Sequence, residues 1–295
     1  MLAQETTSTP NAKLTVILPA FNEEPFVASV IEKTKQTLSQ WSQSWEVIVV
    51  DDGSTDRTAQ IAADASVKIL RHDENLGYGA SIRDGIKAAD GEWIAILDAD
   101  GSYDPSLLLE LLECLPQYDQ VNGARNSEQG SLKFLRTPTK WAIRRLAEWV
   151  SGRKIPDLNT GFKVFKRNIA MRYLWVLPEG FSCSTSLTLA FLCNGYRVKY
   201  IAIPYRKREG KSKFHPVRDT LNYILTIIRM MTFFRPLRIF LPVAFAFGGI
   251  AVIKGLFSIF TSESGLHDAD VILAVAAVLI FSLGLLADLV VSQKR

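Results

Sequence analysis

Cysteine is scarce in this sequence, which counts against zinc and disulfide chemistry. The 295 residues include three cysteines, at positions 114, 183 and 193, and no two of them have the C-x-x-C spacing. This pattern fits a reducing compartment and gives no indication of a zinc site. Internal repeats and low-complexity segments are also absent. Residues 1–12 are polar with no apolar stretch, so we expect a disordered N-terminus and no signal peptide.

Charged residues are moderate in number but unevenly distributed. They make up 22% of the chain against 48% hydrophobic residues, which excludes an intrinsically disordered protein. Residues 197–238 hold eleven Lys or Arg and two acids, a net charge of +9 in a chain whose total is +4, so the remainder carries −5. A basic segment of this kind suits nucleic acid, anionic lipid or a phosphorylated substrate.

Two apolar runs after the basic segment favour a lipid bilayer as partner. Residues 239–260 are apolar apart from Lys254, and residues 271–292 are apolar apart from Asp288. Each run has about the ~20 residues that span a bilayer, with two buried core helices as the alternative. The linker carries three acids and no Lys or Arg, so the positive-inside rule places it outside and both termini in the cytoplasm, at an inner membrane. Because the positive charge adjoins a span and lacks interleaved aromatics, we expect no nucleic-acid partner.

Two predicted strands end in pairs of carboxylates. One apolar run leads into Asp98 and Asp100, and another leads into Asp51 and Asp52. Side chains at i and i+2 project to the same side of an extended chain, so Asp98 and Asp100 are expected to converge. A divalent cation relieves their repulsion, and oxygen ligands suit Mg²⁺ or Mn²⁺. A turn with solvated aspartates is the alternative for either pair taken alone.

Strand and helix patterns alternate along the first half of the chain. This alternation predicts an α/β fold with a largely parallel sheet, in which ligands bind beyond the carboxyl ends of the strands. Three predicted strands end at Pro19, Asp51 and Asp98, so their following residues share one edge of the sheet. The polar residues expected along that edge are Asn22, Glu23, Asp51, Asp52, Asp98 and Asp100. A G-x-G at 77–79 lacks a third glycine in register and is weak as a dinucleotide motif.

Three motifs in this order resemble the inverting GT-A glycosyltransferases. They are P-A-F-N-E at 19–23, D-D-G-S-T-D at 51–56 and D-A-D at 98–100. The resemblance covers residues 13–208 and implies a Rossmann-like GT-A domain that binds a nucleotide sugar. By that likeness Asp98 and Asp100 hold a metal, Mg²⁺ or Mn²⁺, on the pyrophosphate of the donor. The residues that it assigns to nucleotide binding are Pro19, Ala20, Asn22, Glu23, Asp51, Asp52 and Gly53.

Two later segments narrow the resemblance to polyprenyl-phosphate sugar transferases, such as dolichol-phosphate mannose synthase and the bacterial undecaprenyl-phosphate enzymes with two membrane spans. They are N-T-G-F-K at 159–163 and R-K-R-E-G-K-S-K-F at 206–214. The resemblance implies a polyprenyl phosphate acceptor, and cations near it would screen the phosphates of donor and acceptor. A generic anionic-lipid anchor is the alternative for 206–213, and both roles can hold at once. The expected catalytic residues are Asp98, Asp100, Arg125 and Arg208, with Lys211 and Lys213 as further phosphate-binding residues.

Two departures from the family pattern bear on the chemistry. Ser102 stands where a D-x-D-x-Q motif supplies a glutamine, and the segment 181–186 carries no acid to serve as a base. A sugar-hydroxyl acceptor needs a base to remove its proton. A lipid phosphate is already ionised near pH 7, so the missing acid favours that acceptor.

The predicted protein has a cytoplasmic GT-A domain over 13–210, interfacial helices over 211–236 and a two-helix transmembrane anchor over 237–295. Residues 126–138, which are polar with Gly and Pro, predict a mobile loop. Residues 216–232 predict a helix at the membrane interface, with a core helix as the alternative. Its expected apolar face is Val217, Leu221, Ile224, Ile228 and Met231.

The function that follows is inverting transfer of one sugar from a UDP- or GDP-sugar to a polyprenyl phosphate, and self-association is compatible with such a small anchor. A polysaccharide synthase is the second possibility, disfavoured because the sequence has no Q-x-x-R-W and two spans do not readily line a polymer channel. A membrane-tethered subunit that binds a nucleotide sugar without catalysis is the third.

Overall fold

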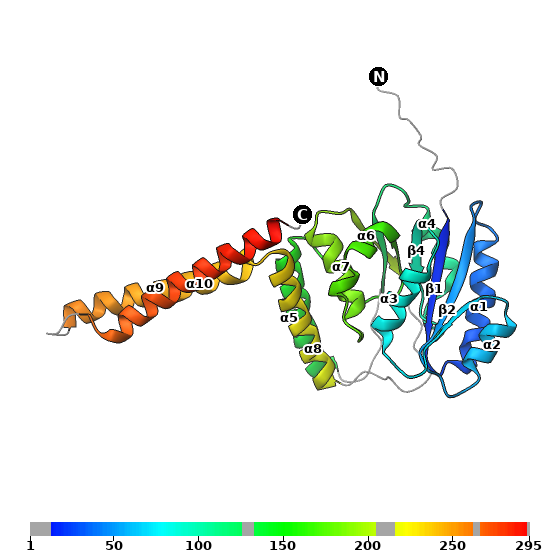
Figure 1. The fold of residues 1–295 in the computed structure, drawn as a ribbon, viewed down its shortest axis with the longest axis horizontal. Helices are drawn as coiled ribbons and strands as arrows, with labels where there is room; N and C mark the ends of the chain where they lie inside the picture. The colour runs from blue at the N-terminus through cyan, green and yellow to red at the C-terminus, as the bar shows by residue number, and fades with distance from the viewer. Residues whose placement is uncertain (1–12, 126–132, 205–215, 262–265, 294–295) are drawn as a thin grey trace, which may run out of the picture. The chain divides into compact units, whose positions relative to one another are not determined.

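A computed structural model describes residues 13–125, 133–204, 216–261 and 266–293 of the protein. The chain divides into two compact units, residues 1–226 and 227–295. The larger unit holds a sheet flanked by helices, and the smaller one is dominated by two long helices (Figure 1). The predicted N-terminal disorder at 1–12 lies outside the described residues.

Seven strands of the larger unit form one sheet in the order β3-β2-β1-β4-β6-β5-β7. Every neighbouring pair is parallel except those made by β6, which runs antiparallel to β4 and β5. The predicted α/β class with a mostly parallel sheet is therefore confirmed. The carboxyl ends of β1, β2, β4 and β5 meet the start of β6 at one edge of the sheet, here called the rim. The strands are β1 Leu14–Ala20, β2 Trp45–Asp51, β3 Lys68–Arg71, β4 Trp93–Ile96, β5 Gln120–Arg125, β6 Lys163–Lys166 and β7 Val198–Ile203.

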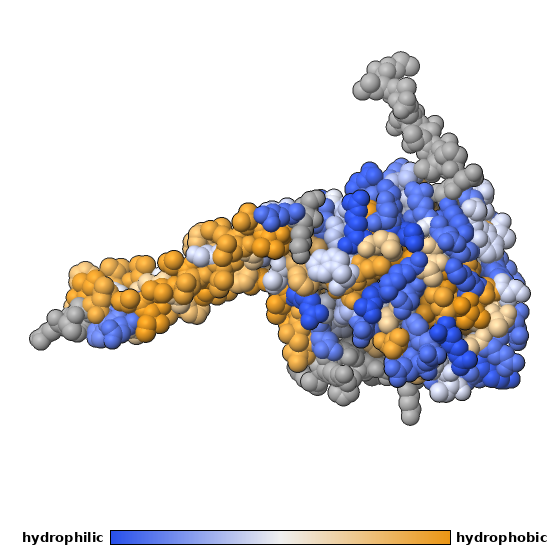
Figure 2. Space-filling model, in the orientation of Figure 1, coloured by the Kyte–Doolittle hydropathy of each residue, from blue (hydrophilic) through white to orange (hydrophobic). Residues whose placement is uncertain are grey.

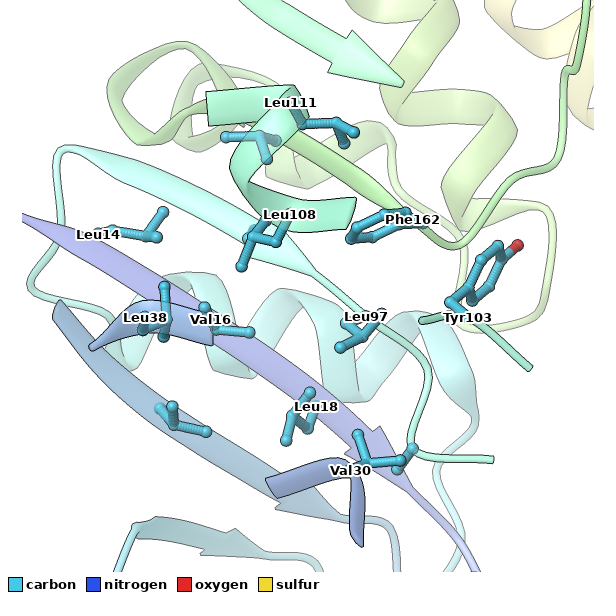
Figure 3. Close-up of a cluster of buried hydrophobic side chains, with 14 of the residues drawn as sticks. Leu14, Val16, Leu18, Val30, Leu38, Leu97, Tyr103, Leu108, Leu111 and Phe162 are labelled. Atoms are coloured by element: carbon cyan, nitrogen blue, oxygen red, sulfur yellow. The ribbon is translucent and has the colours of Figure 1, made fainter. Parts of the chain in front are cut away.

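Helices pack on the sheet and build the core. They are α1 Glu24–Leu38, α2 Thr58–Asp64, α3 Tyr78–Ala88, α4 Leu108–Leu112, α5 Lys133–Ser151, α6 Arg167–Arg172 and α7 Cys183–Cys193, with 3₁₀ turns at Pro105–Leu107 and Leu174–Val176. All seven residues of β1 are buried, so its alternate side chains face two different layers. Leu14, Val16 and Leu18 join side chains of α1 and α4 (Figure 3). Truncating Leu18 to alanine would cost about 2–5 kcal/mol, so this core holds the strands, and hence the rim, in place.

One predicted loop is partly wrong. Of the segment 126–138, residues 126–132 lie outside the described residues, but residues 133–138 are the first part of α5. The Pro and Gly content led to the loop prediction. Further along the helix, Ala147 and Val150 are buried at a spacing of three residues, and this packing outweighs the local composition.

The smaller unit contains α9 Leu237–Thr261 and α10 Asp268–Ser292, and the predicted spans 239–260 and 271–292 lie within them. Both helices are long and apolar enough to cross a membrane. Of the residues in the most apolar stretch of each helix, only 17% in α9 and 11% in α10 are buried. Figure 2 shows the apolar surface along them. Lys254 on α9 lies 3.2 Å from Asp270 at the start of α10, and this ion pair ties the two helices near their connection.

The helix α8, Pro216–Phe234, joins the two units. On its predicted apolar face Leu221 and Ile228 are exposed and Met231 is buried, and Tyr223 and Ile227 outside that face are also buried. Exposed apolar side chains are compatible with a helix at the membrane interface, which stays a prediction.

Candidate functional site

The loop after β1 is tied to the loop after β2 at the rim. Asn22 has a left-handed backbone, with φ of +53°, which asparagine adopts more readily than most residues. Its N–H donates to Ser54 Oγ at 2.9 Å, and its Oδ1 accepts from the Thr55 N–H at 2.8 Å. The N–H of Glu23 donates to Thr58 Oγ1 at 2.9 Å. Both predicted nucleotide-binding residues therefore also hold the rim together.

The residues around Asp51 are buried at the ends of the neighbouring strands β1 and β2. Pro19 and Ala20 are the last residues of β1, and the Ala20 carbonyl accepts from the Asp52 N–H at 2.9 Å. Asp51 is fully buried, and its Oδ2 lies 3.3 Å from Arg71 Nε. Gly53 then turns the chain with φ of +72°.

Asp52 anchors the turn that precedes α3. Its Oδ1 contacts His72 Nδ1 at 2.7 Å and accepts from the Leu76 N–H at 2.9 Å. Its Oδ2 accepts from the Gly77 N–H at 2.9 Å. A carboxylate has about four acceptor positions, so Asp52 uses most of its capacity inside the protein.

Asp98 and Asp100 lie on the loop after β4, the middle strand of the sheet. Asp98 is half-buried, and its Oδ1 accepts from the Tyr78 hydroxyl at 2.9 Å. Asp100 is buried, and its Oδ1 accepts from the Ser102 N–H at 3.0 Å. Gly101, with φ of +71°, makes the turn between Asp100 and Ser102.

The segment that leads into β6 packs directly on Asp98. A Cβ added to Gly161 would lie 2.3 Å from Asp98 Oδ2, so only glycine leaves room for the carboxylate. The Gly161 N–H donates to the Tyr103 hydroxyl at 3.2 Å. Burial raises the pKa of Tyr103, so this hydroxyl stays protonated at neutral pH. Gly161, which belongs to the segment 159–163 that resembles the sugar transferases, therefore forms one wall of the site.

The side chains around the D-x-D pair fit a hard divalent cation, for which they would supply some of the oxygen ligands and the substrate the others. Within the described ranges no cluster of three or more His, Cys, Asp or Glu side chains is placed to hold a metal. The Ser102 hydroxyl is buried and has no hydrogen-bond partner among the described residues. Two carboxylates and an adjacent hydroxyl are oxygen donors of the type that Mg²⁺ and Mn²⁺ prefer, with substrate phosphates supplying further ligands.

Arg125 forms a bidentate ion pair that the sequence did not reveal. Its Nε and Nη2 donate to the two Asp157 carboxylate oxygens at 2.6 and 2.9 Å, and its N–H donates to the same group at 3.2 Å. Burial raises the pKa of Asp157, but the hydrogen bonds and charge of Arg125 outweigh it and hold the pKa below its ordinary value. Asp157 therefore stays ionised and orients the guanidinium. The partners are 32 residues apart, and no local motif connects them.

Lys163 is a second residue whose position was not predicted. Its ammonium group is fully buried and donates to the Ser184 carbonyl at 2.9 Å and to Thr188 Oγ1 at 3.0 Å. Burial lowers its pKa to about 7. The Ser184 hydroxyl in turn donates to the Thr160 carbonyl at 2.5 Å, which connects Lys163 to the wall at Gly161. The sequence carried little signal for this, because Lys163 is the first residue of β6 and the last residue of that short strand, Lys166, is also a lysine.

The basic residues predicted to complete the site, Arg208, Lys211 and Lys213, lie outside the described residues. The acid-free segment 181–186 leads into and begins α7, and its hydroxyl groups have structural partners. Thr185 Oγ1, for example, donates to the Leu158 carbonyl at 3.3 Å.

The sequence matches two family models. The one described as glycosyl transferase family 2 matches residues 15–174, and the one described as GtrB C-terminal hairpin matches residues 235–292.

Three curated relatives are 26–29% identical to the chain over the aligned residues. The dolichyl-phosphate hexose transferase of Haloferax volcanii is 27% identical over 205 residues, 69% of this chain and 87% of the relative. The dodecaprenyl-phosphate galacturonate synthase of Rhizobium johnstonii is 26% identical over 231 residues, 76% and 68% of the two chains. The undecaprenyl-phosphate 4-deoxy-4-formamido-L-arabinose transferase of Pectobacterium carotovorum is 29% identical over 236 residues, 77% and 69% of the two chains.

Among solved structures, glucosyl-3-phosphoglycerate synthase of Mycobacterium tuberculosis, in complex with Mn²⁺, UDP and phosphoglyceric acid, superposes with a TM-score of 0.61. The alignment covers 74% of this chain and 78% of the synthase, at 18% identity. At that identity the likeness shows a shared fold.

Proposed function

The chain belongs to glycosyl transferase family 2, and from this membership we propose that it transfers a single sugar from a nucleotide-sugar donor to a polyprenyl phosphate. The acceptor is supported by the names of relatives 26–29% identical, which refer to dolichyl, dodecaprenyl and undecaprenyl phosphates. The match of residues 235–292 to the GtrB hairpin, together with two apolar helices, supports a site of action at a membrane. We place the domain on the cytoplasmic face of the inner membrane, following the charge asymmetry around the spans.

Exposed apolar side chains of the larger unit support contact with lipid. On α5, Trp141 and Trp149 are 54% and 46% exposed, and the Arg145 guanidinium lies 5.7 Å from the Trp141 ring centre. On α8, Leu221 and Leu225 are 56% and 54% exposed. Tryptophan, arginine and leucine on exposed helix faces are typical of the membrane interface. These faces extend the proposed interfacial region, residues 211–236, to a second helix.

In the proposed reaction, an oxygen of the lipid phosphate forms a bond to the anomeric carbon of the sugar. The bond from that carbon to the nucleoside diphosphate breaks on the opposite face, and its electron pair leaves with the diphosphate, so the configuration inverts. No proton needs to be removed from the nucleophile, because a phosphate monoester is ionised near pH 7. This accounts for a site whose segment 181–186 lacks a carboxylate.

The residues at the rim have distinct proposed roles. Asp98 and Asp100 would hold Mg²⁺ or Mn²⁺, which when bound offsets the charge that develops on the departing diphosphate. Arg125, oriented by Asp157, would face phosphate oxygens. Donor binding is proposed for the β1 and β2 loops, and acceptor binding for the basic residues Arg208, Lys211 and Lys213.

The observation that carries the proposal is the placement of the D-x-D pair directly after the middle strand of the sheet, in a chain that also has two long apolar helices. The test uses the purified full chain in vesicles that contain undecaprenyl phosphate, with a panel of UDP- and GDP-sugars and Mg²⁺ or Mn²⁺. Mass spectrometry of the lipids should show one added sugar and no longer product. Elongating products would indicate a polysaccharide synthase, and nucleotide binding without any glycolipid would indicate a non-catalytic subunit.

Replacing Asp100 tests the metal site within this proposal. Asp100→Ala should lower transfer by about 100-fold or more, because losing a metal ligand removes several kcal/mol of transition-state stabilisation. The melting temperature and vesicle association should stay close to those of Glu113→Ala, a control at an exposed acid on α4's end. Near-normal transfer by Asp100→Ala would overturn the metal role.

A further inference from the structure

Tyr78 contacts the carboxylate that begins the D-x-D motif. Its hydroxyl donates to Asp98 Oδ1 at 2.9 Å, and its ring stacks on Phe181 with centroids 5.8 Å apart and planes inclined by 24°. Neither contact is visible in the sequence, where Tyr78 is the middle residue of the weak G-x-G at 77–79.

The backbone that carries Tyr78 is held on both sides. Gly77, with φ of +98°, is the N-cap residue directly before α3, and its N–H donates to Asp52 Oδ2 at 2.9 Å. The Gly79 N–H donates to the Glu179 carbonyl at 2.6 Å. A Cβ at Gly79 would lie 2.0 Å from the Pro178 carbonyl oxygen, so the turn is in close contact with this neighbouring segment. The tyrosine hydroxyl is therefore presented to Asp98 from a fixed base.

Asp98 is thus held from two directions, by the Tyr78 hydroxyl on Oδ1 and by the backbone of Gly161 against the carboxylate. We propose that Tyr78 is a positioning residue, which fixes the orientation of the Asp98 carboxylate for the divalent cation. This inference rests on the proposed function, because it takes Asp98 to be a metal ligand. Partners that hydrogen-bond a metal-ligating carboxylate orient it before the metal arrives.

Asp52 helps to hold Tyr78 in this position. Its carboxylate binds the N–H groups of Leu76 and Gly77, immediately before Tyr78. Hydrogen bonds thus lead from Asp52 through this turn to Tyr78, and from Tyr78 to Asp98. The motif after β2 is in this way connected to the motif after β4.

Metal binding tests the inference directly. Mn²⁺ titrations followed by water-proton relaxation, with UDP at fixed concentration, compare the full chain with Tyr78→Phe, which keeps the ring stacked on Phe181 but lacks the hydroxyl. We expect the Mn²⁺ dissociation constant to rise by about 10-fold or more, in the range found when a group that orients a metal ligand is removed. Tyr118→Phe, a matched change just before β5 at the opposite edge of the sheet, should leave it unchanged.

Asp98→Asn separates the two ways of failing. If Asp98→Asn loses Mn²⁺ binding while Tyr78→Phe binds as tightly as the unchanged chain, Tyr78 does not position the ligand, and the proposed function stands. If Asp98→Asn also binds Mn²⁺ normally, both the metal site and the inference are wrong. Melting temperatures of all variants check that a change in binding does not reflect unfolding.

Discussion

Gly161→Ala is the most direct test of the geometry around Asp98. The new Cβ would lie 2.3 Å from Asp98 Oδ2 and 2.7 Å from its Cγ. Carbon–heavy-atom contacts are favourable near 3.5–4.0 Å, so the carboxylate or the backbone has to move by about 1 Å. A displacement of that size at a catalytic group costs about 100-fold in rate, or about 2.7 kcal/mol in the activation barrier. The accompanying overpacking should cost about 1–3 kcal/mol of stability.

Gly180→Ala is the matched control, because among the described residues no atom beyond its two chain neighbours lies within 4 Å of a Cβ at that position. Initial rates of glycolipid formation would be measured for both variants across a range of Mn²⁺ concentrations. Gly161→Ala should be slow at every concentration and should need more metal for half-maximal activity. Equal rates for the two alanine variants would refute the close packing of Gly161 on a functional carboxylate.

Two further predictions concern the buried charges. Asp157→Asn should destabilise the chain by about 3 kcal/mol in urea unfolding, since it removes the negative partner of a largely buried, bidentate ion pair with Arg125. Glu24→Gln, which breaks an ion pair to the exposed Arg57, should destabilise the chain much less, because solvent screens that pair, and equal losses would contradict the prediction. For Lys163, the folded pKa of about 7 lies below the ordinary 10.5, so the unfolded chain binds more protons between these values and stability rises with pH. Relative to Lys163→Met, the unchanged chain should gain about 2–3 kcal/mol between pH 7 and pH 9, and a difference that is constant with pH would count against a neutralised lysine.

The fold was predictable from the sequence where its signal is local. Apolar runs of strand length that alternate with helical patterns specify a mostly parallel sheet, because parallel strands require crossover connections. The antiparallel β6 was not predictable in this way, since periodicity carries no information about the direction of a strand. The first turns of α5 were missed for a related reason. Gly and Pro mark a possible loop, but the packing of the helix as a whole decides.

The candidate site was predictable to a similar degree. Asp98 and Asp100 could be proposed as site residues because their two-residue spacing after an apolar strand is visible in the sequence. Asp157 and Lys163 were missed because their partners come from other elements, Arg125 in β5 and Thr188 in α7. Such pairs depend on the three-dimensional arrangement, and a single sequence has no signal for them.

The motif after β2 illustrates why a recognised motif does not by itself assign a role to each residue. Asp52 directs its carboxylate to His72 and to two backbone N–H groups, so about one of its four acceptor positions remains for a ligand. A change at Asp52 would therefore alter the turn that carries Tyr78 as well as any contact with a nucleotide. A loss of donor affinity in such a variant would not by itself show direct contact. Asp98, by contrast, is only half-buried, so of the two it is the more accessible to the proposed metal and diphosphate.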